Sequence, residues 1–261
     1  MKLKNVALIT GASSGLGKSF AEIHAARGGD LVIVARSIDK LNELKKLLEE
    51  NFKVNVYVLP KDLSKIDAAE EIYDELNRAK ISVDYLINNA GLGGQGYFHE
   101  RTMEQDLNLI MVDIIALTKL TKIFLRDFVK RGSGKILNVS STAALMPAGP
   151  MQAVYYAAKS YVTALSEGIW QEIQGTGVTI TTLMSGGMNT GFAKASNLEN
   201  TNLAKAMTFS PEIVAQDGYE AMLNGDMEVI SKLTVEQLEW FKSVPTTPKE
   251  ILLKQLFEMQ K

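Results

Sequence analysis

A tyrosine and a lysine, Tyr155 and Lys159, stand four positions apart in a segment whose apolar pattern predicts a helix over roughly 151–174. Residues at this spacing lie on one face of a helix. A phenol has an ordinary pKa of about 10, and a neighbouring ammonium favours its ionised form. Such a pair can give a proton to a carbonyl oxygen during reduction or take one from an alcohol during oxidation. The adjacent Tyr156 faces another side of the helix and is predicted to pack.

A glycine-rich turn follows the apolar segment 6–10 and opens a predicted helix over 15–28. Gly11 lets the chain turn sharply, Gly15 lets the backbone approach a pyrophosphate, and Gly17 permits close packing of helix on strand. The helix N-terminus adds free N–H groups and a positive dipole. The sequence therefore predicts a dinucleotide site made by Gly11, Ser13, Ser14, Gly15, Leu16 and Gly17.

The spacing T-G-x-x-x-G-x-G resembles that of the short-chain dehydrogenase/reductase family, as do Asn88-Asn89-Ala90-Gly91 and the Tyr155/Lys159 pair. The resemblance covers roughly residues 5–192. It implies that the first asparagine steadies the sheet and that Asn89, Ala90 and Gly91 lie against the cofactor. It also implies that Asp62, followed by Leu63, holds the adenine, and that Gly186 and Thr190 contact the cofactor near its nicotinamide.

The cofactor preference is predicted from Arg36, which follows the apolar segment 31–34. An acid at this position would repel a 2′-phosphate, whereas an arginine can bind it through charge-assisted hydrogen bonds. We therefore expect NADP(H) as the cofactor, and NAD(H) is the less favoured alternative. It is also possible to interpret Arg36 as an exposed residue that is solvated and makes no contact with the cofactor.

A serine at the end of the segment 135–139 completes the expected catalytic group. In the family such a serine binds the substrate oxygen, and the spacing to Tyr155 favours Ser141 over Ser140. The resemblance then implies that Ser141 and Tyr155 hold the oxygen, that Tyr155 supplies the proton, and that Lys159 holds the nicotinamide ribose. The activity expected is that of a carbonyl reductase or alcohol dehydrogenase.

Two positions depart from the family pattern. Asp113 stands where many members have an asparagine that holds a water on the proton path. Its charge would favour the protonated forms of Lys159 and Tyr155, which puts the proton relay in doubt. Ser185-Gly186 replaces the usual Pro-Gly, so the backbone beside the nicotinamide is expected to be looser.

The elements that must position these residues alternate along the chain. Apolar, β-branched runs predict buried parallel strands, and amphipathic segments between them predict helices. The predicted strands are 6–10, 31–34, 54–58, 85–88, 135–139, 178–183 and 228–230; the predicted helices are 15–28, 38–50, 65–79, 104–130, 151–174, one after Ser210, 233–243 and 248–260. This alternation predicts an α/β, Rossmann-type, doubly wound, mostly parallel sheet of about seven strands.

We expect one domain over 1–261, with about 190–261 forming the substrate loop and the C-terminal helices. These C-terminal helices could cover the site, pack on a subunit or touch a membrane.

The net charge of −2 indicates neither nucleic acid nor an anionic membrane as partner, and the absence of cysteine excludes thiolate chemistry. No His/Asp/Glu cluster has metal-ligand spacing, and neither His24 nor His99 is expected to bind metal. No apolar run is long enough to span a membrane, and a cytoplasmic protein is expected.

The substrate is expected to be apolar, because Leu145, Met146 and the segment 188–207 are largely apolar. A homodimer or homotetramer is expected from the family, through an apolar stripe that includes Ile110 and Ile114 and that could equally be core. Two alternatives remain. One is another chemistry on this scaffold, such as epimerisation or dehalogenation, and the other is an NADP(H)-binding regulatory or redox-sensing protein with weak or no turnover.

Overall fold

The protein is built on one parallel sheet. The computed structural model describes residues 3–188, 191–202 and 209–261. Within these residues seven strands pair in parallel in the order β3-β2-β1-β4-β5-β6-β7. They are β1 (Ala7–Thr10), β2 (Leu31–Ala35), β3 (Val56–Pro60), β4 (Tyr85–Asn88), β5 (Gly134–Ser141), β6 (Val178–Ser185) and β7 (Glu228–Ser231). The strand order reverses between β1 and β4, and ligands bind in the crevice at such a point.

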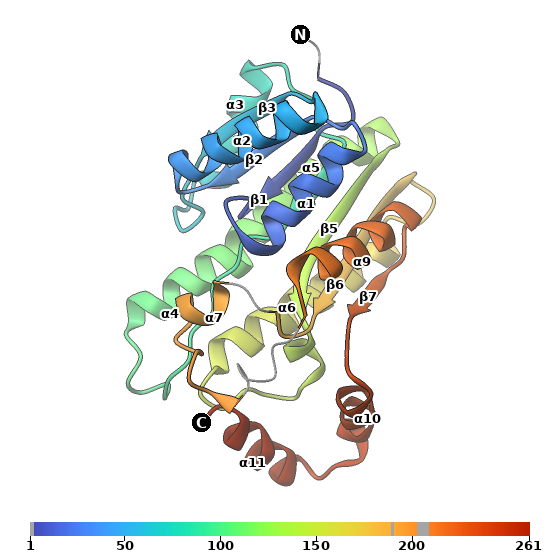
Figure 1. The fold of residues 1–261 in the computed structure, drawn as a ribbon. Coiled ribbons are helices and arrows are strands. Elements are labelled where there is room, and N and C mark those ends of the chain that lie inside the picture. The colour runs from blue at the N-terminus through green and yellow to red at the C-terminus, as the bar shows by residue number, and fades with distance from the viewer. Residues whose placement is uncertain (1–2, 189–190, 203–208) are drawn as a thin grey trace.

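Helices cover both faces of the sheet, as the predicted doubly wound fold requires (Figure 1). One face carries α1 (Gly15–Ala26), α2 (Ile38–Phe52) and α9 (Pro211–Asn224), and the other carries α3 (Ala68–Arg78), α5 (Leu117–Arg131) and α6 (Ala153–Glu172). The Rossmann-type α/β prediction is confirmed.

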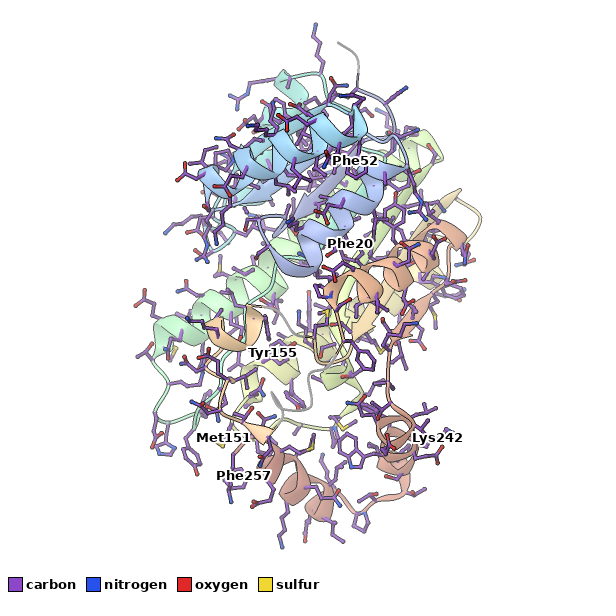
Figure 2. The ribbon with its side chains drawn as sticks, viewed as in Figure 1. Phe20, Phe52, Met151, Tyr155, Lys242 and Phe257 are labelled. Atoms are coloured by element: carbon purple, nitrogen blue, oxygen red, sulfur yellow. The ribbon has the colours of Figure 1, made fainter. Side chains whose placement is uncertain are left out.

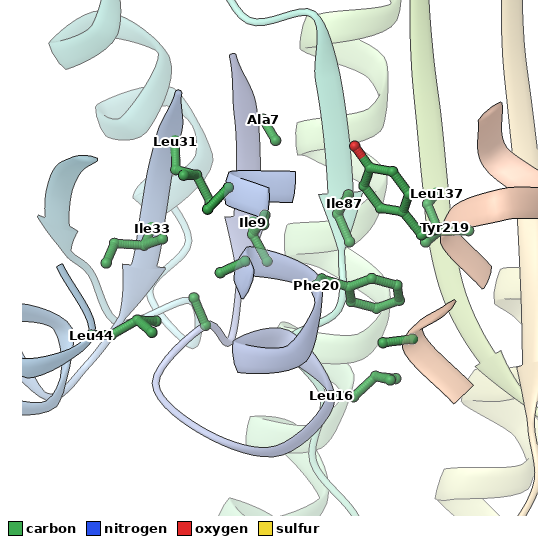
Figure 3. Close-up of a cluster of buried hydrophobic side chains, with 14 of the residues drawn as sticks. Ala7, Ile9, Leu16, Phe20, Leu31, Ile33, Leu44, Ile87, Leu137 and Tyr219 are labelled. Carbon is green, nitrogen blue, oxygen red and sulfur yellow. The ribbon is translucent and has the colours of Figure 1, made fainter. Parts of the chain in front are cut away.

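The core lies in two layers, one on each side of the sheet. Successive strand residues point to opposite faces, so Ile9 packs under α1 and α2 while Leu8 packs under α3 and α5. Figure 3 shows Phe20 of α1 and Tyr219 of α9 beside Ile87 and Leu137. Burial on both faces explains why the strands read as nearly continuous apolar runs.

The remaining helices extend beyond the carboxyl end of the sheet (Figure 1). They are α4 (Met103–Ile110), α7 (Phe192–Ala195), α10 (Val235–Ser243) and α11 (Lys249–Met259). The helix expected over 104–130 is continuous but contains a π-helical turn, Met111–Ala116, between α4 and α5. Across the described residues, no helix has the length and apolarity needed to cross a membrane.

Candidate active site

Lys159 and Asp113 form a buried ion pair under the carboxyl end of β4. Lys159 Nζ lies 3.1 Å from Asp113 Oδ2, and the two side chains are 7% and 0% exposed. The other carboxylate oxygen accepts the backbone N–H of Leu92 at 2.7 Å, and Lys159 Nζ also donates to the Val139 carbonyl at 3.3 Å. Gly91 fits closely over the pair, because a Cβ there would lie 3.2 Å from Asp113 Oδ2 and 3.3 Å from Lys159 Nζ.

Burial and charge act in opposite directions on this pair. Burial lowers the pKa of Lys159, but the charges of Asp113 and Tyr155 outweigh it and raise the pKa above its ordinary value. Burial raises the pKa of Asp113, against the charge of Lys159 and the Leu92 hydrogen bond. Lys159 is therefore held as an ammonium, as the sequence led us to expect for a lysine facing an aspartate.

Tyr155 lies one helical turn before Lys159 on α6, with the lysine Nζ 5.6 Å from its ring centre. It is half-buried, and its ring lies 5.9 Å from that of Phe192 on α7. Figure 2 shows Tyr155 between Phe20, which lies above it, and Phe257 of α11, which lies below it. Tyr156 is buried and packs against Leu252 and Leu256 of α11, which agrees with its predicted packing role.

The two serines at the end of β5 differ in what they bind. Ser140 donates its hydroxyl to the Lys159 carbonyl at 3.0 Å and lies 2.8 Å from the Thr163 hydroxyl. Among the described residues, the Ser141 hydroxyl accepts only the Ala143 N–H, at 3.1 Å, and Ser141 begins the short 3-10 helix Thr142–Leu145. Ser141 thus keeps its hydroxyl proton for another acceptor, which favours it over Ser140 as the substrate-binding serine.

Asn88 ties the central strands to the helices behind them. Its amide donates to Asn138 on β5 at 2.9 Å and to Thr121 on α5 at 3.0 Å. Asn138 in turn donates to Ser166 of α6 at 3.0 Å. A buried network of this kind fixes α6, and with it Tyr155 and Lys159, relative to the sheet. The sequence did not single out Asn138, although its position within a buried strand was a usable signal.

The glycine turn is held by residues that follow β4. Thr10 Oγ1 accepts the N–H groups of Asn89 and Ala90, each at 3.0 Å, and the Asn89 amide donates to the Thr10 carbonyl at 2.8 Å. Gly11 has φ +68°, and a Cβ there would lie 2.8 Å from the Asn89 amide nitrogen. Only glycine fits that position without strain.

The start of α1 has the features that a dinucleotide needs. Ser14 stands at the N-cap, but its side chain makes no capping hydrogen bond. The first-turn N–H groups therefore lack the usual side-chain acceptor, and such groups bind phosphate well. Gly15 has φ +52°, Leu16 and Gly17 are buried, and Ser13 is partly buried. These residues fit the diphosphate of a dinucleotide.

Arg36 and Asp62 lie at the ends of neighbouring strands. Arg36 is exposed directly after β2, and Asp62 follows β3. Asp62 accepts the N–H and hydroxyl of Ser64 at 3.0 and 2.9 Å. Burial opposes ionisation of Asp62, but these hydrogen bonds and the charges of Lys65 and Arg36 prevail and lower its pKa. Asp62 is thus ionised near Arg36, while Leu63 is buried.

The loop after β6 is described only in part. A Cβ at Gly186 would lie 3.0 Å from the Lys232 carbonyl, so the backbone runs close to the end of β7 there. Thr190, expected to contact the cofactor, lies outside the described residues.

Sequence reasoning missed the contribution of the far C-terminus. Gln260 is buried and accepts the Gln152 side-chain amide, and its own amide lies 3.5 Å from the Tyr156 hydroxyl. Its backbone carbonyl accepts the Gln95 amide at 2.9 Å. The loop Gly91–Gly96 is thus bonded to Gln260 through the Gln95 side chain and, through the Gln95 N–H, to the Ser196 carbonyl.

An apolar cluster surrounds this end of the site. It joins Met146 and Leu145, which follow β5, to Tyr155 and to side chains of the last two helices: Trp240, Phe241, Leu252, Leu256 and Met259. The two histidines lie outside this cluster. His24 is buried between Tyr219 and the Asn5 carbonyl, and His99 is exposed.

A family model described as short chain dehydrogenase matches residues 5–201. The chain belongs to the short-chain dehydrogenase family. It is 30% identical over 233 residues to the very-long-chain 3-oxoacyl-CoA reductase of Mus musculus, a match that covers 86% of this chain and 72% of the mouse protein. Membership of this family makes it an oxidoreductase.

Solved structures share the fold across nearly the whole chain. A short-chain dehydrogenase from Sphingobium yanoikuyae in complex with NADPH is 28% identical with a TM-score of 0.82, and the match covers 93% of this chain and 94% of that one. A structure described in terms of 7beta-hydroxysteroid dehydrogenase stereoselectivity is 25% identical with a TM-score of 0.83, and the match covers 98% of this chain and 97% of that one.

Proposed function

We propose that this protein is an NADP(H)-dependent oxidoreductase of the carbonyl reductase or alcohol dehydrogenase type, acting on an apolar small molecule. The observation that supports this most strongly is the placement of Lys159. Its ammonium lies buried beneath Gly91, next to the strand-order reversal, and one helical turn from Tyr155. That places a fixed positive charge beside a phenol at the edge of the sheet where ligands bind.

When bound, NADP(H) would supply or accept the hydride. Ser141 and Tyr155 would hold the substrate oxygen through their hydroxyl groups, and Tyr155 would transfer the proton. Lys159 would bind the nicotinamide ribose and, together with Asp113, would set the electrostatic surroundings of the phenol. The cofactor would lie against the backbone of Gly186 and of the segment Asn89, Ala90 and Gly91.

The preference for NADP(H) rests on charge at the end of β2. Arg36 is exposed there and free to contact a 2′-phosphate, and the residue before it, Ala35, offers no carboxylate to the ribose. The similar Sphingobium protein is in complex with NADPH. Asp62, ionised and fixed by Ser64, would accept hydrogen bonds from the adenine amino group.

The substrate class follows from the apolar cluster around Tyr155. Leu145, Met146 and the C-terminal helices surround the phenol with apolar side chains. This favours a ketone on a long apolar chain, and the name of the mouse relative makes a 3-oxoacyl thioester the first substrate to try. We further propose that the whole chain works as one domain, with about 190–261 forming the substrate side, and that it assembles as a homodimer or homotetramer.

The test is oxidation of NADPH, followed at 340 nm, with 3-oxoacyl-CoA thioesters of increasing chain length and a set of bulky apolar ketones, and the same series with NADH. Turnover with NADPH should fall by about 10³-fold or more in Tyr155→Phe, because the proton donor is lost. Tyr156→Phe is the matched control and should retain activity. NADPH binding without turnover on any of these substrates would instead favour a regulatory or redox-sensing protein.

A further inference from the structure

The active-site lysine carries its own buried counterion. Asp113 and Lys159 face each other at 3.1 Å, and together they are more completely excluded from water than any other ion pair in the described residues. Asp113 is placed there by the π-helical turn Met111–Ala116. A π turn adds a residue to the helix and so re-aims the side chains within it, and such turns are frequent at functional sites.

In the part of the chain that the structure describes, few other charges surround the pair. The loop after β4 contributes only backbone, at Gly91 and Leu92, and β5 contributes the Val139 carbonyl. From α6, the titratable group that faces Lys159 is Tyr155. Among the described residues, the charges that act on Lys159 are those of Asp113 and Tyr155.

We propose that Asp113 neutralises the charge of Lys159 and thereby keeps the Tyr155 phenol protonated, so that Tyr155 acts as a proton donor for carbonyl reduction and alcohol oxidation is confined to alkaline solution. This inference rests on the proposed function. Asp113 acts through Lys159 and is a positioning residue.

The physical argument compares a lone ammonium with an ion pair. Lys159 Nζ lies 5.6 Å from the centre of the Tyr155 ring. A lone ammonium beside a phenol stabilises the phenolate, whereas an ammonium paired with a carboxylate presents only a dipole, whose field falls off faster. In reduction, hydride adds to the carbonyl carbon and the phenol proton goes to the oxygen; the phenolate left behind regains a proton from solvent. In oxidation the alcohol loses hydride to the cofactor and its proton to a phenolate, which must already be present.

The test compares the wild type with Asp113→Asn, which keeps the shape and removes the charge. Tyrosinate absorbance at 295 nm is titrated in the cofactor-free protein, and the signal of Tyr155 is isolated by subtracting the titration of Tyr155→Phe. In Asp113→Asn the signal should appear at lower pH, by about one unit.

Activity gives the second readout. The pH profiles for reduction and for oxidation should both move to lower pH by about one unit in Asp113→Asn, so that oxidation at neutral pH rises severalfold relative to reduction. Asp106→Asn is the matched control, because Asp106 forms another well-buried ion pair, with Arg101 at 2.7 Å, away from Lys159. It should leave both profiles in place.

Superimposable titrations and profiles for the wild type and Asp113→Asn would overturn the inference. If Asp113→Asn does not fold, Asp113→Ser removes the same charge and takes its place in both comparisons with the wild type. If no substrate is turned over, the proposed function fails, while the titration at 295 nm still tests the role of Asp113.

Discussion

The hydroxyl of Ser140 donates to the backbone carbonyl of Lys159, so that the end of β5 is bonded directly to the turn of α6 that carries the lysine. Within the residues that the structure describes, its neighbour Ser141 makes only a local hydrogen bond, with the Ala143 N–H. Adjacent serines in the same strand therefore differ in what they bind, and we propose that Ser140 fixes the helix while Ser141 binds the substrate.

Substitution of the two serines should separate stability from catalysis. Ser140→Ala removes a buried hydrogen bond and should lower the free energy of unfolding by about 1–2 kcal/mol, with little change in kcat for the folded enzyme. Ser141→Ala should lower kcat by about 10²-fold or more, because a donor to the substrate oxygen is lost. Urea denaturation measures the change in stability, and steady-state kinetics measure the change in kcat. A large loss of kcat in Ser140→Ala together with unchanged kcat in Ser141→Ala would contradict the prediction.

Arg36→Asp should reverse the cofactor preference. An arginine–phosphate contact contributes about 1.5–3 kcal/mol, so KM for NADPH should rise at least about tenfold while KM for NADH stays the same or falls. Because Arg36 is exposed, the fold should be unaffected. Lys46→Asp makes the same charge change at another exposed position. An equal loss of NADPH affinity in that control would trace the effect to net charge rather than to a phosphate contact.

Stability should decrease in acid because of His24. Burial lowers the pKa of this histidine, although the carbonyls of Asn5 and Asp30 oppose the effect. The unfolded chain therefore takes up the proton at about pH 6.5, while the folded protein takes it up only at lower pH. Stability from this group is complete above about pH 6.5 and is lost as the pH falls toward the folded pKa, by at most about 1.4 kcal/mol per unit.

Chemical denaturation between pH 5 and pH 8 measures this slope. His24→Gln should have a shallower slope, whereas His99→Gln should match the wild type because His99 is exposed. These are the two histidines of the chain, so the comparison isolates the buried one. Equal slopes in the wild type and His24→Gln would refute the assignment.

Gln260→Ala should destabilise the substrate side of the molecule. The change removes the partner of the Gln152 amide, which is 2% exposed, and leaves that amide without an acceptor. Such a group costs about 1–3 kcal/mol, which corresponds to a fall in Tm of several degrees for a protein of this size. Lys261→Ala is the control, since Lys261 pairs with Glu258 on the surface. A Tm unchanged in Gln260→Ala would mean that water replaces the lost contacts.

The pattern of apolar and polar residues along the chain was enough to predict most of the strands and helices. Strands that are buried on both faces and wholly apolar, such as β2, stand out because nothing polar interrupts them, and the ends of the predicted strands lie within two residues of those observed. The predicted helices agree as well, except that the π turn at Met111–Ala116 changes the backbone without changing the apolar pattern. The helix Phe192–Ala195 is too short to show a period and was not predicted.

Contacts between distant residues were harder to foresee. Family spacing led to Asp113, but the sequence suggested a bridging water rather than the direct pair with Lys159. The contact of Gln152 with Gln260 joins residues 108 positions apart, with no local signal in either segment. The expected apolar stripe on the long helix is partly core, because Leu117, Leu120 and Thr121 are buried, while Ile110 and Ile114 are half-buried.

The bonds from Thr10 to Asn89 and Ala90 also bear on the order of folding. These residues lie 79 and 80 positions apart, and β1 pairs in parallel with both β2 and β4. A growing or refolding chain can pair β1 with β2 early, but the glycine turn gains its supports only when β4 docks. Closing so long a loop is entropically costly and slow. Affinity for a dinucleotide should therefore emerge late in refolding, together with the rest of the sheet.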